Sequence, residues 1–258
     1  MKLISLNIWG GKVFEPLIDF VKQEAGDTDI FCFQEVFSSP VARVSRGTRT
    51  NILADLREVL SGFTGYFVPT QDGFDNEGPV DFTISTGLAT FMKKSLAVES
   101  TEEQLVCGAY NSASGGDPTT QPAGFFCVRC VVNGKKIAVC NFHGTAFPGT
   151  KLDTEKRLLQ SENIRNFLNR ETYAKILCGD FNLLPDTESM RILEKSLTNL
   201  IRTFNISQTR SSLSPYYGTP TEQKFADYAL VSPDITVKDF RVPDILISDH
   251  LPMILEFA

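Results

Sequence analysis

Short apolar runs, each about as long as one β-strand, recur along almost the whole chain. They are rich in Val, Ile, Leu and Phe and are bounded by Gly, Pro, Asn or Asp, which is typical of strands. So many short strands can bury their apolar faces only in sheets that pack on another layer. The strands are expected at 2–8, 29–34, 65–70, 87–93, 125–132, 136–142, 174–180, 225–231, 235–240 and 252–257.

Between these runs the apolar spacing changes to that of helices. Apolar residues recur every three or four positions at 14–21 and 52–60, which predicts two amphipathic helices. A third helix is predicted at about 153–169, with Asp153 or Thr154 as its N-cap, and a short fourth follows Pro185-Asp186. We find no repeat and no linker, so we expect residues 1–258 to form one domain of α/β class, with two packed sheets covered by helices.

Two segments, 71–86 and 108–122, are rich in Gly, Pro, Ser, Asp and Asn and are expected to be long loops. A third loop is expected at 145–152. Loops of this length in a compact protein are usually functional or disordered.

Composition describes an ordinary globular chain, with 42% hydrophobic and 22% charged residues among 258. The N-terminus lacks the long apolar region of a signal peptide, and no run approaches the roughly 20 apolar residues of a membrane span. We therefore expect a cytoplasmic protein without a transmembrane segment, and a monomer. The net charge of −6 argues weakly against binding to long duplex DNA, because proteins that bind it usually carry a basic stripe.

The six cysteines are predicted to be buried, inert thiols rather than a disulfide framework. Cys127 and Cys130 have the spacing of a C-x-x-C motif, but they lie in a predicted strand. Three positions along a strand place two side chains on opposite faces, so this pair is not expected to bind a metal.

Polar residues at the ends of the apolar runs are the strongest indication of function. A strand holds its last side chain rigidly, and the loop beyond it opens a cleft. The set supplies carboxylates, carboxamides and the only two imidazoles of the chain: Asn7, Glu35, His143, Asp180, Asn182, Asp227, Asp249 and His250. Oxygen-rich ligation of this kind suits Mg²⁺, with Mn²⁺ as a possible substitute, whereas zinc would prefer more His or Cys.

The ordered motifs LNIWG, FQEV, NFHG, GDFN, FADY and SDHLP resemble those of the endonuclease/exonuclease/phosphatase superfamily, also called DNase I-like. They extend from residue 3 to residue 252. GDFN and SDH carry most of the specificity, and all six in order are hard to obtain by chance. The resemblance implies a four-layer α/β/β/α sandwich with the site at one end of two mixed sheets, in agreement with the strands and helices predicted above.

The resemblance also implies roles for individual residues. Glu35 resembles the main metal ligand, with Asn7 and Asp249 close to the cation. Asp180 resembles the group that orients or deprotonates the attacking water, and Asn182 resembles the group that helps to fix that water or the phosphate. His250 resembles a phosphate-contacting histidine held by Asp227, and His143 resembles a second one, whose own partner the sequence does not identify.

Each of these residues also has a structural interpretation. Asn7 alone would be assigned to a turn, Asp180-Phe-Asn182 could be an Asx turn, and a lone histidine is usually a satisfied core residue. Arg157 and Gln160, three apart on the predicted third helix, are expected to buttress the sheet rather than to contact substrate. Lys151, in the loop after His143, is expected to be solvated.

The predicted activity is Mg-dependent hydrolysis of a phosphodiester by metal- and His-assisted attack of water, without a covalent intermediate. Nucleic acid is the first expected substrate, cleaved by a nuclease or a DNA end-processing enzyme. The alternative is a phosphatase or phospholipase C-type hydrolase acting on a phosphoinositide, sphingomyelin or another small phosphate ester. A binding module that has lost catalysis is disfavoured, since every expected polar position is filled. An enzyme for long duplex DNA should show basic or aromatic insertions that enter a groove, whereas the two loops at 71–86 and 108–122 are rich in Gly, Ser and Asp. This slightly favours a small, single-stranded or end-specific substrate, or one that is not a nucleic acid.

Overall fold

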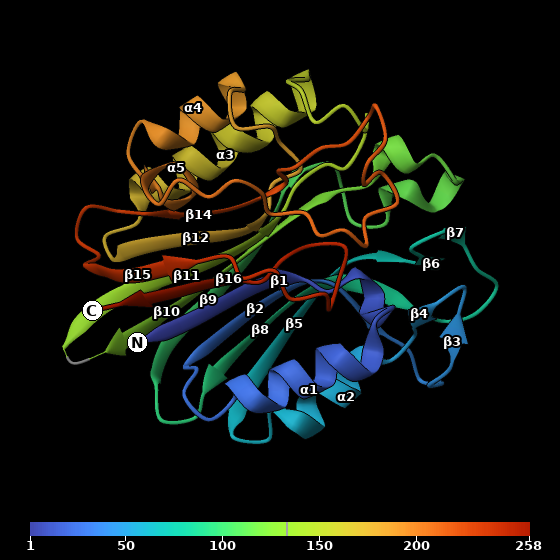
Figure 1. Cartoon of the computed structure of the whole chain (residues 1–258), viewed down its shortest axis with the longest axis horizontal. Helices are drawn as coiled ribbons and strands as arrows, with labels where there is room; N and C mark the ends of the chain where they lie inside the picture. The colour runs from blue at the N-terminus through green and yellow to red at the C-terminus, as the bar shows by residue number, and fades with distance from the viewer. Residues whose placement is uncertain (133) are drawn as a thin grey trace.

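Two six-stranded β-sheets stack on each other in the computed structural model, which describes residues 1–132 and 134–258 (Figure 1). The first sheet has the strand order β15 (Val237–Arg241), β16 (Met253–Phe257), β1 (Lys2–Asn7), β2 (Ile30–Ser38), β8 (Ser85–Lys93) and β5 (Phe63–Asp72). The second has the order β13 (Thr198–Asn199), β14 (Asp227–Val231), β12 (Ala174–Asp180), β11 (Lys135–His143), β10 (Ala123–Val132) and β9 (Ala97–Cys107).

Helices cover the outer face of each sheet (Figure 1). The first sheet is covered by α1 (Phe14–Glu24) and α2 (Ile52–Val59), and the second by α3 (Glu155–Arg170), α4 (Glu188–Glu194) and α5 (Leu200–Thr203). The predicted four-layer α/β/β/α sandwich is confirmed. Thr154 is the N-cap of α3, and its side chain accepts a hydrogen bond from the backbone N–H of Arg157.

The apolar side chains form two clusters that match these layers. One fills the space between the sheets and beneath α3, α4 and α5, and the other lies beneath α1 and α2. Central strands such as β2 are buried on both faces, because each sheet has a neighbouring layer on either side. All six cysteines are free and buried, as predicted.

The structure differs from the prediction at β9, which no apolar run indicated. Most of the side chains of this edge strand face solvent, so its sequence, AVESTEEQLVC, carries charge where a buried strand would carry apolar residues. The segment 71–86 is also more ordered than a loop. It contains the ends of β5 and β8 and a small hairpin of β6 (Phe74–Asp75) and β7 (Gly78–Pro79).

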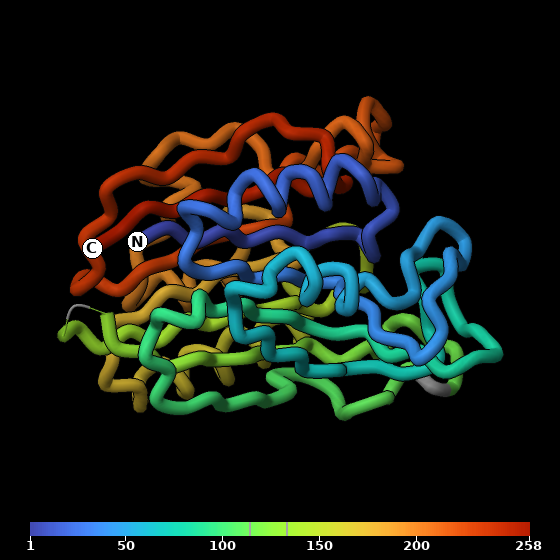
Figure 2. The backbone as a smooth tube through the Cα atoms, turned by 90° about the horizontal axis from the view of Figure 1, so that it is seen from below, coloured from blue at the N-terminus to red at the C-terminus, as the bar shows by residue number. Residues whose placement is uncertain are grey.

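The segment 108–122 holds two short 3₁₀ turns, η2 (Ser112–Gly115) and η3 (Pro118–Thr120). A second small hairpin, β3 (Val44–Ser45) with β4 (Thr48–Arg49), lies beside the β6–β7 hairpin at the end of the sandwich farthest from the two termini (Figure 2).

Two parallel strand pairs determine where the polar strand ends meet. β1 pairs with β2 in one sheet and β11 pairs with β12 in the other, and the carboxyl ends of all four strands lie at the end of the sandwich away from the termini (Figures 1 and 2). β2 packs against β11 and β12 across the interface between the sheets. Side chains that follow these strands are therefore brought to one place. Within the described residues, no helix has the length and apolar character needed to cross a membrane.

Candidate active site

The ends of the four parallel strands bring the first group of predicted residues together. Asn7 is the last residue of β1, His143 the last of β11 and Asp180 the last of β12, while Glu35 lies within β2. His143 and Asp180 are direct neighbours in the β11–β12 register. Asp227 opens β14 and pairs with Asp180 from the antiparallel side.

A register shift in β2 directs the side chain of Glu35 toward the site. The pairing of β2 with β8 shifts register between Phe33 and Val36, and Glu35 has a positive φ of 53°. A β-bulge adds a residue to one strand and re-aims the side chains beside it. A left-handed backbone at a residue other than Gly is uncommon and tends to occur at functional positions.

The end of β12 is shaped by Gly179. Its φ is 141°, and a Cβ at this position would lie 1.9 Å from the carbonyl oxygen of Phe142 on β11. Only glycine allows the two strands to approach so closely. Asn182 follows with a φ of 54°, and its N–H donates a 2.9 Å hydrogen bond to Oδ1 of Asp180, which fixes that carboxylate at the strand end.

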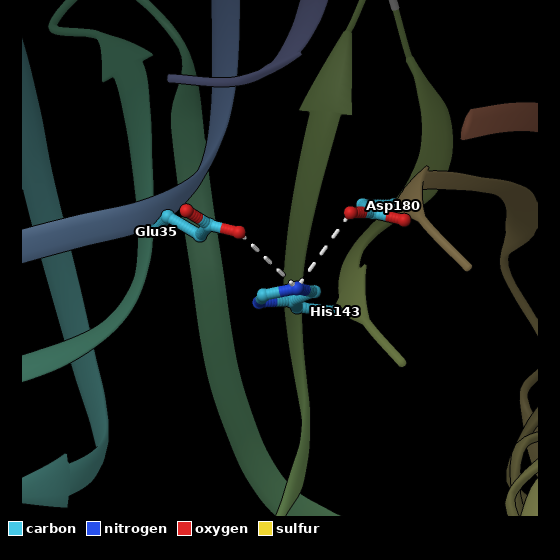
Figure 3. A group of neighbouring side chains, drawn as sticks. All are labelled: Glu35, His143 and Asp180. Atoms are coloured by element: carbon cyan, nitrogen blue, oxygen red, sulfur yellow. Dashed lines mark ion pairs between the residues drawn. The ribbon is translucent and has the colours of Figure 1, made fainter. Parts of the chain in front are cut away.

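Glu35, His143 and Asp180 form a compact cluster (Figure 3). Nε2 of His143 lies 3.9 Å from Oε1 of Glu35 and 3.7 Å from Oδ2 of Asp180, so the imidazole stands between the two carboxylates. The amide nitrogen of Asn7 donates to both carboxylates, at 2.9 Å to Oε1 of Glu35 and 3.0 Å to Oδ2 of Asp180. Asn7 therefore ties the two sheets together at the site.

Asn76 from the β6–β7 hairpin also contacts the cluster, and no motif or periodic pattern predicted this contact. Its amide nitrogen donates a 2.9 Å hydrogen bond to Oε2 of Glu35. Both carboxylate oxygens of Glu35 thus accept from amides on opposite sides.

Asp180 is a buried anion surrounded by cationic groups. Burial alone would raise its pKa, but His250, His143, Lys151 and Arg210 outweigh this effect and lower the pKa to about 2. The carboxylate is therefore charged at neutral pH, and it can accept a proton or orient a water molecule.

His250 and Asp227 form the second part of the site. Nδ1 of His250 lies 2.9 Å and 2.7 Å from the two carboxylate oxygens of Asp227, and both residues are buried. Nε2 lies 3.6 Å from Oδ2 of Asp180. Burial and Arg210 lower the pKa of His250, but Asp227, Asp249 and Asp180 raise it more, so the pKa lies above its ordinary value.

Arg210 occupies the free side of His250 and was missed by the sequence analysis. Its Nη1 contacts Nε2 of His250, its Nη2 donates to Oδ2 of Asp249 at 2.9 Å, and its backbone bridges to that of His250. Arg210 and Nε2 of His250 are therefore close enough to contact the same phosphate.

Asp249 lies beside this second part rather than in the Glu35 cluster. Besides the contact with Arg210, Oδ1 of Asp249 lies 3.3 Å from Ser248 Oγ and 3.8 Å from Nε2 of His250. The hydroxyl of Ser248 donates to the backbone carbonyl of Asn7 at 2.7 Å, which links the last motif to the first.

Lys151 differs from the prediction of a solvated loop residue. Its ammonium group contacts Oδ1 of Asn182, whose amide nitrogen donates to the Gly144 carbonyl at 3.0 Å. Burial, the largest effect, lowers the pKa of Lys151 to about 8, although Asp180 and Glu35 act in the opposite direction. The site therefore holds a lysine that an apolar pattern could not reveal.

Arg157 and Gln160 hold the loop that carries Lys151. The fully buried guanidinium of Arg157 donates to four backbone carbonyls, those of Thr145, Ala146, Pro148 and Leu152. Gln160 Oε1 accepts from the N–H of Thr145 at 3.1 Å. Their role is structural, as expected, but they support the loop after His143 rather than the sheet.

Asn141 joins the two sheets directly beneath the site. Its Oδ1 accepts a 2.7 Å hydrogen bond from Gln34, and its amide nitrogen donates to the backbone carbonyls of Phe33 and Ala89 at 3.1 Å and 3.2 Å. A buried polar group needs such partners, and here they fix the β2 bulge relative to β11.

The donor set fits a divalent metal ion. One ligand atom each from Glu35, His143 and Asp180 lies within 4.8 Å of the others, and the same holds for Asp180, Asp227 and His250. Two carboxylates beside an imidazole suit a hard or borderline cation, and the buried charge of Asp180 would be balanced by it. Glu35 and Asp180 are the residues placed to hold such an ion, with His143 beside them.

A family model and several solved structures are similar to this chain. The model of the Endonuclease/Exonuclease/phosphatase family matches residues 4–250, whereas no curated protein sequence gives a significant match. A family protein from Leptotrichia buccalis C-1013-b aligns with a TM-score of 0.71 at 17% identity, covering 100% of this chain and 99% of that one.

Two further structures have the same fold. The mannosyl-6-phosphatase Bt3783 of Bacteroides thetaiotaomicron VPI-5482 aligns with a TM-score of 0.69 at 19% identity, covering 100% of this chain and 99% of that one. The human Nocturnin catalytic domain with a bound sulfate anion aligns with a TM-score of 0.67 at 19% identity, over 100% and 93% of the two chains. With nearly all of its length matched by the family model and the family's sandwich as its fold, the chain belongs to the endonuclease/exonuclease/phosphatase family of hydrolases.

Proposed function

We propose that this protein is a Mg²⁺-dependent phosphoester hydrolase that activates water with Asp180 and binds the phosphate with His143 and His250. The observation that carries the proposal is the convergence of Glu35, His143 and Asp180, from three different strands, within 4.8 Å. A buried carboxylate beside two partly buried ionisable groups is costly for folding, so the cluster needs a chemical reason.

The metal site is assigned to Glu35 and Asp180, with His143 beside it and Asn7 holding both carboxylates. Asn7 and Asp249, which the sequence predicted as metal ligands, are assigned supporting roles. Asn7 presents its amide nitrogen to the carboxylates, and Asp249 pairs with Arg210. When bound, the cation would polarise the phosphoryl oxygens and lower the pKa of a nearby water.

The residues of the chain supply the remaining functions. Asp180 is charged at neutral pH and accepts the proton of the attacking water, while Asn182 fixes that carboxylate through its backbone N–H. His250, oriented by Asp227, and His143 donate to the non-bridging oxygens of the phosphate. No nucleophilic side chain is required.

Two substrate classes follow from the same chemistry. The first is the phosphodiester of nucleic acid expected from the sequence, cleaved by a nuclease or an end-processing enzyme. The second is a small phosphate ester, and one observation favours it: a half-open pocket of about 620 Å³ shares Lys151 and Arg210 with the site.

Hydrolysis is tested with purified protein in Mg²⁺, Mn²⁺ or EDTA. The substrates are single- and double-stranded DNA, RNA, bis-p-nitrophenyl phosphate and p-nitrophenyl phosphate. Glu35→Gln and Asp180→Asn serve as variants that keep the size of each side chain. We expect metal-dependent turnover that each substitution reduces at least about 100-fold.

Calorimetric titration of Mn²⁺ provides a readout that does not depend on turnover. The wild-type protein should bind the ion more tightly than Glu35→Gln. If every substrate is processed equally by wild type and Glu35→Gln, or if EDTA leaves the rate unchanged, the proposal is wrong.

A further inference from the structure

A pocket of about 620 Å³ opens between the segments 146–151 and 210–226. We call this cavity the side pocket. Lys151 and Arg210 line it and also touch the catalytic residues, Lys151 through Asn182 and Arg210 through His250. A molecule in the side pocket would therefore lie next to the place where His250 meets a phosphate.

Two cations, Lys151 and Arg210, meet at this junction, and Arg210 is paired with the carboxylate of Asp249. The guanidinium of Arg210 is held by Asp249 at 2.9 Å and by Ser214 Oγ at 3.3 Å, so its planar fork is already oriented. Arginine forks recognise phosphate oxygens in pairs. A phosphomonoester ends in three acceptor oxygens and carries about −1.5 to −2 charges at pH 7, whereas a diester carries one, so a fork and an ammonium group that line one pocket suit the terminal phosphate of a monoester.

The wall of the side pocket contributes aromatic rings. Phe147, Tyr216 and Phe225 line it, and Tyr216 is 57% exposed, which leaves its ring available to a ligand. Glu222 and Gln223 add polar groups on the same wall. Aromatic faces with a few polar groups are typical of sites for flat or ring-shaped small molecules.

We propose that the side pocket binds the ring of a small phosphomonoester, while Lys151 and Arg210 hold its terminal phosphate against the catalytic residues. This inference rests on the proposed phosphoester hydrolysis and names its substrate class. The pocket volume lies within the range of small-molecule sites, about 300–1,000 Å³. The net charge of −6 also disfavours a long polyanion.

A nucleoside or a sugar could supply the ring, since both present a face that stacks on an aromatic side chain. Four ligands distinguish a nucleoside ring from a sugar ring, and a monoester from a diester. They are adenosine 5′-monophosphate, glucose 6-phosphate, the ring-free glycerol phosphate and a dinucleoside monophosphate diester. Binding is measured by calorimetry and turnover by phosphate or product release, each in the presence of Mg²⁺.

Tyr216→Ala and Tyr217→Ala form a matched pair, because both tyrosines are more than half exposed and only Tyr216 lines the side pocket. We expect Tyr216→Ala to raise KM and Kd about fivefold for the preferred ring-bearing monoester, with kcat nearly unchanged. Glycerol phosphate should bind both variants with the same Kd. Tyr217→Ala should have the KM, Kd and kcat of wild type for the ring-bearing monoester.

Arg210→Gln tests the phosphate contact, with Arg191→Gln on the exposed side of α4 as its control. We expect Arg210→Gln to lower kcat/KM for the monoester relative to the diester about tenfold. Arg210→Lys keeps the charge but not the planar fork of donors. Its ratio of kcat/KM for the monoester to kcat/KM for the diester should lie between those of wild type and Arg210→Gln.

The outcomes separate the two proposals. Binding of the monoesters without turnover would contradict the hydrolytic function and leave the side pocket supported. Turnover with an unchanged monoester-to-diester ratio in Arg210→Gln, or with equal KM in the two tyrosine variants, would overturn the side pocket alone. A preference for the diester or for oligonucleotides over every monoester would overturn it as well.

Discussion

Asn76 donates a 2.9 Å hydrogen bond to Oε2 of Glu35 from a hairpin that lies 41 residues further along the chain. The opposite oxygen of Glu35 accepts from Asn7 at the same distance. The carboxylate therefore cannot rotate without losing one of two amide donors. A ligand held in this way stays in its productive orientation between turnovers.

Replacement of Asn76 tests whether this orientation matters. Asn76→Ala should lower kcat about tenfold, which corresponds to the roughly 1.4 kcal/mol of one charge-assisted hydrogen bond. The midpoint of thermal unfolding should change little. Asn166→Ala, on the exposed face of α3, is the control. Equal rates for the two variants would show that Asn7 alone orients Glu35.

Asp227 is predicted to act through His250. Asp227→Asn removes the negative charge beside Nδ1, so the pKa of His250 should fall and kcat should drop about 100-fold. A raised pKa keeps the ring protonated to higher pH, so its loss should move the alkaline limb of the kcat profile to lower pH. The measurement is kcat from pH 5 to 9, with the exposed Asp234→Asn as control. An unshifted limb would contradict this assignment.

Asn141 should contribute strongly to stability. Asn141→Ala removes the partner of Gln34 and three further contacts, and it leaves polar atoms buried without hydrogen bonds. We expect the free energy of unfolding in urea to fall by about 3 kcal/mol. Asn163→Ala, which removes one bond to the Val106 carbonyl from a half-buried position, should cost less. A similar loss in both variants would argue against the bridging role of Asn141.

Asp75 makes stability depend on pH in the acid range. Burial raises its pKa, but Arg46, Ser45 and the N–H of Glu77 outweigh burial and place the pKa below the ordinary value of 3.8. A lowered pKa stabilises the fold fully above the unfolded pKa, and this stabilisation is lost as the pH falls through the folded pKa.

Asp75→Asn should therefore cost about 1–2 kcal/mol at pH 7, and the difference from wild type should shrink below about pH 4. Urea unfolding at pH 7, 5 and 3 measures it, with the exposed Asp81→Asn as control. A constant difference at all three values would mean that the Asp75 charge does not contribute.

The architecture could be predicted because the core strands obey simple patterns. KLISLN, IFCFQ and AKILCGD are mostly apolar and almost entirely buried, since both faces of a central strand are covered in a four-layer fold. The edge strand β9 has no such constraint, and its exposed glutamates concealed it. The ordered motifs then indicated which strand ends carry chemistry.

The residues that the sequence did not reveal come from loops. Arg210, Asn76 and Lys151 lie in no periodic pattern, and each reaches the site only through long-range contacts, with His250, Glu35 and Asn182 respectively. A loop residue is placed by what it packs against rather than by its neighbours in the chain.

The sequence by itself thus determined the fold class and the motif residues, because buried strands can be identified from their apolar residues and the motifs from their order along the chain. The tertiary structure alone decided how those residues are held. Asn7 faces Glu35 with its amide nitrogen, and Asp249 pairs with Arg210. The physical reason is that hydrogen bonds and charge pairs depend on distances of a few ångströms between atoms that lie far apart along the chain.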